Sequence, residues 1–400
     1  MKKLDINCLA TINFEISWEK NQITHKECYL ARKVNLWRDI FPTGMKEKLV
    51  GLPVGGEISL SYEPGQAVPA RQKNNIIKTD PRHFIRKKFF NKPIIPRNGR
   101  FYPRSLLGGK YFFPQDMRPC RITSINQDSI VADCGHPLAD QKINIKARVL
   151  NFAENSSETG GRLTHWAEEI LDTGPGMQSR YEQQETDFAS SEFKRADGDR
   201  DSIFYQAPRL IDHIDHQASD HMRNNYSSLI KPGMKVLDLM SSVNSHLPEG
   251  YDLDVVGLGM NMEEMQANPL LNAHIVHDLN LNPQLPFADS SFDAIICSLS
   301  VEYLTHPYRV AREASRVLKP GGIFIVGFSN RWFPPKVTEL WQELHEFERT
   351  GFVLDLFHKT DSFENLSTIS IRNWWRPEDD AHIDEIWTSD PVYIVSARKT

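Results

Sequence analysis

Cysteine is scarce in this 400-residue chain, and its placement argues against two kinds of structure. The five cysteines are odd in number, and no two of them are spaced as CxxC. The sequence therefore predicts neither a disulfide framework nor a zinc site, and we expect no bound metal. The five are Cys8, Cys28, Cys120, Cys134 and Cys297.

Long apolar runs and an excess of basic residues are also missing. No stretch approaches the roughly 18 apolar residues of a membrane-spanning helix. Asp5 and Asn7 interrupt the apolar core that a signal peptide would need. The formal net charge is -5, whereas proteins that bind nucleic acid usually carry clustered basic residues. We therefore expect a cytoplasmic protein with no membrane or nucleic-acid partner.

The residues that are present fall into stretches of different pattern, and the chain is long enough for two domains. Residues 1–155 predict a β-rich domain, because apolar residues alternate along 9–18 and 58–62, and 121–133 has the pattern of a hairpin. Residues 156–205 are polar. They predict either a linker or an N-terminal extension that packs on the second domain.

Residues 206–400 alternate between short apolar runs and amphipathic stretches. This pattern predicts an α/β domain whose seven-stranded, mostly parallel sheet has helices on both faces and ends in an antiparallel strand. Helices are expected at 262–267, 310–318 and 336–349. Strands are expected at 235–239, 254–258, 274–278, 292–298, 322–328, 352–357 and 392–397.

The loops that follow these strands carry the residues of chemical interest, because open α/β sheets bind ligands beyond the carboxyl ends of their strands. In chain order the sequence has "VLDL", then "DLN" and "LPFADSSFDAIICSLSVEYL", then "REASRVLKPGGIFIVGFSN". This order resembles the class I methyltransferases, specifically the group often labelled type 11, over about residues 207–399. The resemblance implies a Rossmann-like methyltransferase domain that binds S-adenosylmethionine.

The same resemblance implies roles for individual residues. Asp238 would open the loop that holds the cofactor, Asp278 and Leu279 would face the adenine, and the segment from Ser298 to Ser300 would line the methionine part. The "LKPGG" segment would be structural, because it turns the chain into the fifth strand.

Two loops depart from the family pattern. Met240, Ser242 and Asn244 stand where the family has the glycines of DxGxGxG. Ser241 and Ser242 are small and carry hydroxyls, so this loop can still hold the methionine end of the cofactor. After the second strand the usual acid is missing, and the chain reads Gly259-Met260-Asn261. There Asn261 can bond a ribose hydroxyl without bringing a charge.

Candidate catalytic residues lie before the first strand and after the fourth. A general base is needed only if the methyl acceptor carries a proton at working pH. We predict His213 and Tyr303 as catalytic residues, with His216 and Glu302 as further candidates. A helix over residues 209–216 would place some of these side chains on one face, as a solvated face or as a metal site. After the fifth strand, Asn330 and Arg331 are candidate substrate contacts or simply the start of a helix.

The first domain has a resemblance of its own. The segments "FPTGMKEKLVGLPVGGEISLSY", "KTDPRHF" and "GHPLADQ" resemble the SlyD kind of FKBP-type prolyl isomerases over about residues 13–152. The resemblance implies a small β domain with an inserted flap, at about 99–132, that binds peptides or unfolded chains. Ala67-Val68-Pro69 stands where that family has a tyrosine turn in its pocket. This departure favours binding of a peptide or protein over isomerisation.

Two functions from different classes follow. The favoured one is an S-adenosylmethionine-dependent methyltransferase of a small molecule or a protein, with an N-terminal peptide-binding or prolyl isomerase-like domain. The alternative is a chaperone-like binding protein whose methyltransferase half is a degenerate, non-catalytic scaffold. The missing glycines favour the alternative, while Asp238, Asp278 and the strand pattern favour the enzyme.

Overall fold

The chain forms two compact units in a computed structural model. The structure describes residues 2–85, 88–89, 92–108, 112–154, 161–178, 185–188 and 193–400. Unit 1 comprises Met1–Asn21, His25–Ser190 and Glu343–Glu348, and unit 2 comprises Gln22–Thr24, Ser191–Gln342 and Arg349–Thr400. Of the predicted 156–205 segment, residues 156–160, 179–184 and 189–192 lie outside the described part of the chain. No helix among the described residues is long and apolar enough to cross a membrane.

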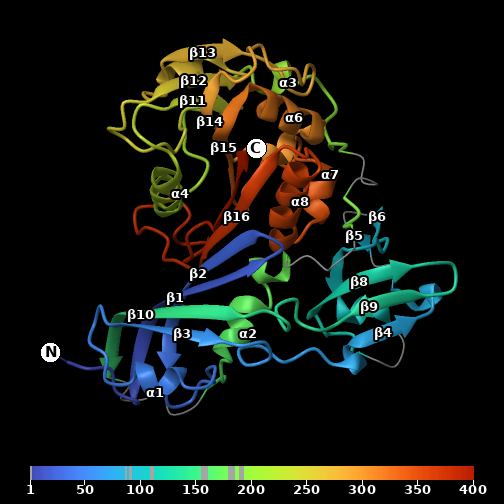
Figure 1. Cartoon of the computed structure of the whole chain (residues 1–400), viewed down its shortest axis with the longest axis vertical. Helices are drawn as coiled ribbons and strands as arrows, with labels where there is room; N and C mark the ends of the chain where they lie inside the picture. The colour runs from blue at the N-terminus through green and yellow to red at the C-terminus, as the bar shows by residue number, and fades with distance from the viewer. Residues whose placement is uncertain are drawn as a thin grey trace. The chain divides into compact units, whose positions relative to one another are not determined.

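Unit 1 contains a sheet with the strand order β2-β1-β10-β3 (Figure 1). Apolar residues alternate along β1, so Ile12, Phe14 and Ile16 all face one side and are buried in the core of this unit. β10 pairs antiparallel with both β1 and β3. The strands are β1 (Cys8–Lys20), β2 (Ile23–Asn35), β3 (Glu57–Tyr62) and β10 (Ile143–Glu154), and the helices are α1 (Met45–Leu49) and α2 (Trp166–Leu171).

A second, smaller sheet of unit 1 has the order β4-β9-β8-β7 and its own apolar cluster, which includes Leu107, Ile122 and Ala132. The hairpin predicted at 121–133 is confirmed as β8 and β9. This sheet spans more of the chain than the segment predicted for a flap. Its strands are β4 (Ile76–Thr79), β7 (Phe101–Pro103), β8 (Pro119–Ile125) and β9 (Ile130–Asp133). A separate pair of strands is formed by β5 (Lys88–Phe89) and β6 (Lys92–Pro93). The one-turn helices of unit 1 are η1 (Lys73–Asn75), η2 (Pro81–His83), η3 (Arg104–Leu107) and η4 (Pro175–Gln178).

Unit 2 is built on seven strands in the order β13-β12-β11-β14-β15-β17-β16. The first five are parallel to one another, and β17 is antiparallel to both β15 and β16. This is the mostly parallel, Rossmann-like arrangement that the sequence predicts. The strands are β11 (Lys235–Leu239), β12 (Asp254–Gly259), β13 (Ala273–Val276), β14 (Phe292–Ser298), β15 (Leu318–Phe328), β16 (Phe363–Arg372) and β17 (Val392–Lys399).

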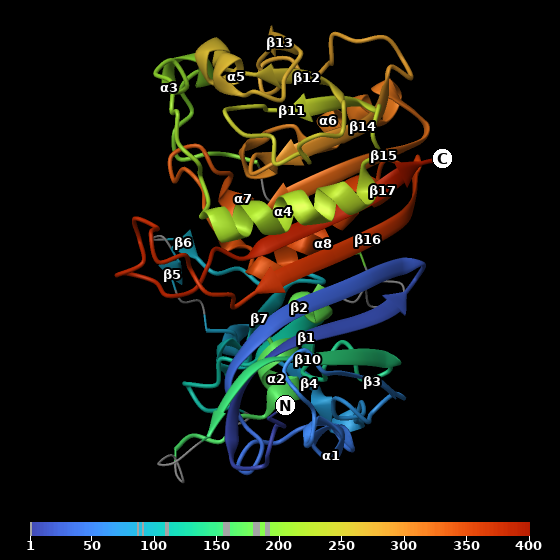
Figure 2. The ribbon, with the colours of Figure 1, turned by 90° about the vertical axis from the view of Figure 1, so that its left-hand side faces the viewer.

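Helices cover both faces of the unit 2 sheet: Figures 1 and 2 show α4 on one face and α6 and α8 on the other. In α6, Val310, Ala314 and Val317 recur at helical spacing and are buried against the sheet, which is why this stretch forms a helix there. The helices are α3 (Asp201–Phe204), α4 (His216–Leu229), α5 (Met262–Ala267), η5 (Val301–Tyr303), α6 (Pro307–Val317), α7 (Glu339–Glu343) and α8 (Glu346–His358).

Three sequence predictions for unit 2 are wrong. The strand predicted at 352–357 lies inside α8, because a short apolar run is compatible with either a buried strand or a buried helix. The single helix predicted at 336–349 is instead α7 and the start of α8, and the strand β16 was missed. The helix predicted over 209–216 is absent, because α4 begins at His216 and Asp215 caps it by accepting the Ala218 N–H at 3.0 Å.

Candidate functional site

One cleft in unit 2 lies at the carboxyl ends of β11, β12 and β14, where parallel α/β sheets bind their ligands. The thirteen residues that the sequence predicts as cofactor-binding or catalytic all line this cleft, whereas the further candidates His216 and Glu302 do not. The thirteen are His213, Asp238, Met240, Ser241, Ser242, Gly259, Met260, Asn261, Asp278, Leu279, Ser298, Ser300 and Tyr303. The structure brings the set together, and their individual roles stay predictions.

The loop after β11 turns sharply without the glycines of the family pattern. Met240 adopts a φ of 58°, a left-handed conformation in which glycine is normally favoured. Two hydrogen bonds to Asp238 fix this loop: the hydroxyls of Ser241 and Ser245 each donate to its Oδ2 at 2.6 Å. Burial raises the pKa of Asp238 to about 6, although these two hydrogen bonds favour its charged form.

The end of β12 fits closely under this loop. A Cβ atom on Gly259 would lie 2.2 Å from the carbonyl oxygen of Ser241, so only glycine permits this approach. Asn261 caps α5 by accepting the N–H groups of Glu263 and Glu264, at 2.9 and 3.1 Å. Its amide nitrogen donates to the Tyr205 carbonyl at 2.9 Å. The ribose contact predicted for Asn261 therefore stays a prediction, and it requires one of these bonds to open.

Glu264 is an important residue that the sequence analysis missed. Its carboxylate accepts the backbone N–H of Arg209 at 2.8 Å and the hydroxyl of Ser242 at 2.7 Å. It thus ties the loop after β11 to residues 205–213, which we call the strap. The strap has a further hydrogen bond to the loop after β11, because the Asn244 amide donates to Asp212 at 2.9 Å. An acid three residues after a capping asparagine was the available signal, since this spacing is that of a capping box.

Replacing Glu264 by alanine is expected to lower the free energy of unfolding of unit 2 by about 1–3 kcal/mol, because it removes two hydrogen bonds to a buried charged group. It should also make the strap more open to proteolysis. Urea unfolding and limited proteolysis measure both effects. Glu263→Ala, an exposed neighbour on the same helix, is the matched control. Equal effects of the two variants would contradict this role for Glu264.

In the chain after β13, only one of the two carboxylate oxygens of Asp278 accepts hydrogen bonds from the described residues. Oδ1 of Asp278 accepts the N–H groups of Asn280 and Leu281, at 2.9 and 3.1 Å. Its Oδ2 has no hydrogen bond with any residue that the structure describes. The sequence analysis also missed Asn280. Its amide links the chain after β13 to two other stretches, by donating to Asp201 at 2.8 Å and to the Tyr303 carbonyl at 3.0 Å.

The chain after β14 forms the opposite wall. The hydroxyl of Ser298 lies 2.9 Å from that of Tyr226, and the Ser300 hydroxyl donates to the Ser298 carbonyl at 2.6 Å. Tyr303 is buried, and its hydroxyl accepts the backbone N–H of Phe333 at 2.9 Å. Burial raises the pKa of Tyr303 well above its usual value, so the phenol is protonated near pH 7, and its catalytic role stays a prediction.

His213, predicted as a catalytic residue, lines the cleft. Its ring meets the Phe333 ring edge-on, with centroids 5.3 Å apart, and makes no hydrogen bond with the described residues. Burial lowers the pKa of His213, so the imidazole is neutral near pH 7. His216 lies elsewhere: it is exposed at the start of α4 and 3.8 Å from Asp379. Among the described residues no cluster of three His, Cys, Asp or Glu side chains is placed to hold a metal.

A cation stacked on aromatic rings closes one end of the cleft, and the sequence analysis missed it as well. The Arg209 guanidinium lies 4.5 Å from the ring centre of Phe204 and 5.1 Å from that of Phe333. Such cation–π contacts help to fix the strap in place. The contact with Phe333 joins residues far apart in the chain, so no local sequence pattern predicts it.

Comparisons with known proteins match part of unit 2. A family described as "Methyltransferase domain" matches residues 246–326. Ubiquinone/menaquinone biosynthesis C-methyltransferase UbiE of Bartonella henselae is 32% identical over 135 residues, 33% of this chain and 50% of that protein. Demethylmenaquinone methyltransferase of Renibacterium salmoninarum is 33% identical over 107 residues, 26% of this chain and 45% of that protein. The chain thus spans about half the length of these relatives.

A solved SAM-dependent methyltransferase from Aquifex aeolicus shares 16% identity over 50% of this chain and 97% of its own, with a TM-score of 0.32, which is too low to bear on the fold. The family match and the two relatives bear on unit 2, and the FKBP-like assignment of unit 1 stays a prediction. Unit 2 therefore carries a methyltransferase domain of the S-adenosylmethionine-dependent class.

Proposed function

We propose that this protein transfers the methyl group of S-adenosylmethionine to an acceptor bound beside the cleft of unit 2. The observation that carries the proposal is the gathering of all thirteen predicted residues around one cleft, at the carboxyl ends of the parallel strands. Residues from five separate stretches of chain meet there. The fold brings these stretches together, and the acceptor atoms that they leave open in the cleft support a bound cofactor.

The side chains of the cleft fit the proposed cofactor. S-adenosylmethionine supplies an electrophilic methyl group on a sulfonium, and it also carries an ammonium and an adenine amino group. Oδ1 of Asp238 and Oδ2 of Asp278 are acceptor atoms without a hydrogen bond to the described residues. Asp238 would receive the ammonium and Asp278 the adenine amino group, because carboxylate oxygens accept such donors and stabilise positive charge.

His213 would be the general base where the acceptor must lose a proton. The neutral imidazole has a free lone pair, and burial keeps it neutral at the pH at which it must work. The two relatives are methyltransferases of quinone biosynthesis by name, and one is named a C-methyltransferase. A carbon or a hydroxyl group activated by loss of a proton is the kind of acceptor that a base at this place would serve.

The test is a calorimetric titration of the folded protein with S-adenosylmethionine and with S-adenosylhomocysteine. We expect binding, and we expect Asp238→Ala to weaken it by roughly 10–100-fold, the value of a hydrogen bond between charged groups. Asp254→Ala is the matched control, because Asp254 lies at the amino end of β12, the opposite end of the sheet. No binding by the folded wild type, or equal binding by the two variants, would count against the proposal.

We also propose a binding role for unit 1, as a SlyD-like domain that holds a peptide or protein. Phe113 and Met117, between β7 and β8, are 82% and 66% exposed, and they would be the apolar contacts of such a partner. Val68, where that family has its pocket tyrosine, is buried in the core of unit 1. If the titration shows no cofactor binding, this binding role becomes the favoured function of the whole chain.

A further inference from the structure

A second pocket adjoins the cofactor cleft of unit 2. The two share several walls, among them His213, Tyr303 and Phe333. Arg331, Trp332 and His382 line only the second pocket. We call it the acceptor pocket. Because a methyl acceptor must reach the cofactor without displacing it, a neighbouring pocket with shared walls is where it would bind.

Most of the acceptor pocket is apolar or aromatic. Ile211, Ile214 and Leu299 supply aliphatic surface, and Tyr303 and Phe333 stack with their ring centroids 5.8 Å apart. Ile211 is 64% exposed at the rim. Surfaces of this kind bind flat or apolar molecules by removing them from water.

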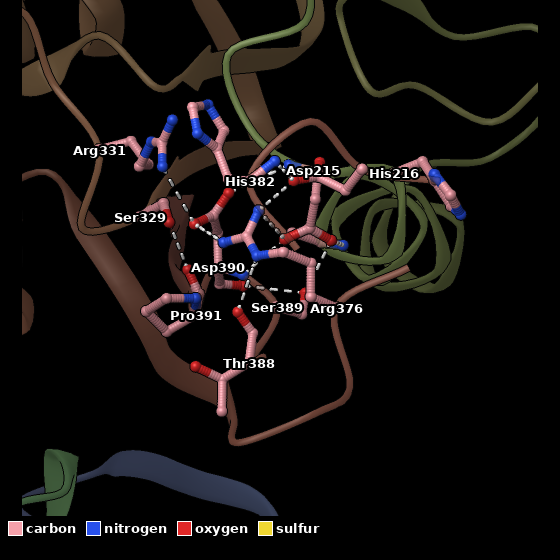
Figure 3. Close-up of polar contacts among 12 residues, drawn as sticks. Asp215, His216, Ser329, Arg331, Arg376, His382, Thr388, Ser389, Asp390 and Pro391 are labelled. Atoms are coloured by element: carbon pink, nitrogen blue, oxygen red, sulfur yellow. Dashed lines mark hydrogen bonds and ion pairs between the residues drawn. The ribbon is translucent and has the colours of Figure 1, made fainter. Parts of the chain in front are cut away.

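Arg331 is the charged group of this pocket with donors to spare. Its one contact with the described residues is an ion pair at 3.8 Å between its Nη1 and Oδ1 of Asp390. That same oxygen already accepts a hydrogen bond from Arg376 at 2.7 Å, so Asp390 is not a dedicated partner. Figure 3 shows the ion pair between Arg331 and Asp390 at the edge of the group of contacts that Arg376 makes.

The acidic residues near this pocket are accounted for. Asp212 accepts the Asn244 amide at 2.9 Å. On the loop that carries His382, Asp380 pairs with Arg376 at 2.9 Å. Glu385 lies 3.3 Å from the ring of His382 itself. None of these carboxylates pairs with Arg331 in the part of the chain that the structure describes.

We propose that the methyl acceptor is an apolar or aromatic acid, whose carboxylate binds Arg331 while its body fills the acceptor pocket against Trp332 and Phe333. A guanidinium offers two parallel N–H groups that match a carboxylate, so the pair would orient the acceptor as well as hold it. His213, at the boundary with the cleft, then faces the end of the acceptor that is methylated. This inference rests on the proposed function.

The experiment uses the full chain with 2-naphthoate as the probe and 2-naphthamide as its neutral counterpart. Fluorescence titrations are run on the wild type, on Arg331→Gln and on Arg312→Gln, an exposed position on α6 that lines neither pocket. We expect the wild type and Arg312→Gln to bind 2-naphthoate about tenfold or more tightly than 2-naphthamide. Arg331→Gln should lose that preference while still binding 2-naphthamide.

A parallel titration with S-adenosylhomocysteine separates the two proposals. We expect equal binding by the wild type and Arg331→Gln, because Arg331 does not line the cofactor cleft. Normal cofactor binding without a preference for the acid, or with a preference that survives in Arg331→Gln, overturns the acceptor pocket alone. Absence of cofactor binding overturns the methyltransferase proposal, and an Arg331-dependent preference would then still support an acid-binding pocket.

Discussion

Replacing Arg376 by methionine is expected to lower the free energy of unfolding of unit 2 by about 3–5 kcal/mol, the usual result of removing one partner from a buried ion pair. The side chain of Arg376 is 1% exposed. It contacts Asp390 at 2.7 Å, Asp380 at 2.9 Å and Asp215 at 3.6 Å. Without the guanidinium, the buried carboxylates of Asp215 and Asp390 would face each other, with only the longer ion pair from Arg331 to Asp390, at 3.8 Å, left to compensate them.

The loss should be this large because Arg376 joins three parts of unit 2 (Figure 3). Its Nε also donates to the carbonyl of Thr388 at 3.1 Å. Asp215 caps α4, and its carboxylate accepts the Asp390 N–H and the Ser389 hydroxyl as well. Removing the cation therefore disturbs the start of α4 and the loop before β17 together.

Urea unfolding, with hydrogen exchange of the α4 amides to report on unit 2, measures this effect. Arg312→Met, at an exposed position, should change stability by no more than about 0.5 kcal/mol. Adding Asp390→Asn to Arg376→Met should recover part of the loss, because one uncompensated charge is removed. A loss below 1 kcal/mol in Arg376→Met, with no recovery in the double variant, would show that water solvates these carboxylates.

The strands of unit 2 could be predicted well where an apolar run is short and bounded by turn residues. β11 and β14 begin and end where the sequence placed them. The segment 352–357 could not be assigned in this way, because burial on all sides erases the periodicity that separates a strand from a helix. It belongs to α8. β16 was missed because no such bounded run marks it.

The candidate site could be predicted to the extent that topology alone determines it. The carboxyl ends of parallel strands share one edge, so residues that follow β11, β12 and β14 must meet there. The contacts of Glu264 with Arg209 and Ser242 could not be foreseen, because they join side chains 55 and 22 positions away. Met240 likewise shows that a left-handed turn can persist without glycine when serine hydroxyls fix the loop.

The second large effect is expected at Glu302, a buried acid whose carboxyl oxygens have no hydrogen-bond partner among the described residues. It lies in η5 and is 1% exposed, and neither carboxyl oxygen is hydrogen-bonded within the described structure. Burial raises its pKa from 4.5 to about 8, although its own backbone N–H and the charge of Arg349 oppose this. The residue is therefore neutral near pH 7, and ionising it places a buried charge next to a stretch of chain whose Ser300 and Tyr303 line the cleft.

Glu302→Gln is expected to stabilise unit 2 in a way that grows with pH. Because the pKa is higher in the folded state, the wild type loses stability as pH rises from about 4.5 to about 8, and the variant does not. The gain should be small at pH 5 and reach a few kcal/mol at pH 9, since one pKa unit corresponds to about 1.4 kcal/mol. Urea unfolding at both pH values tests it, with exposed Glu249→Gln as the control. A gain that is the same at pH 5 and pH 9 would mean that Glu302 ionises in the folded protein as readily as it does in the unfolded chain.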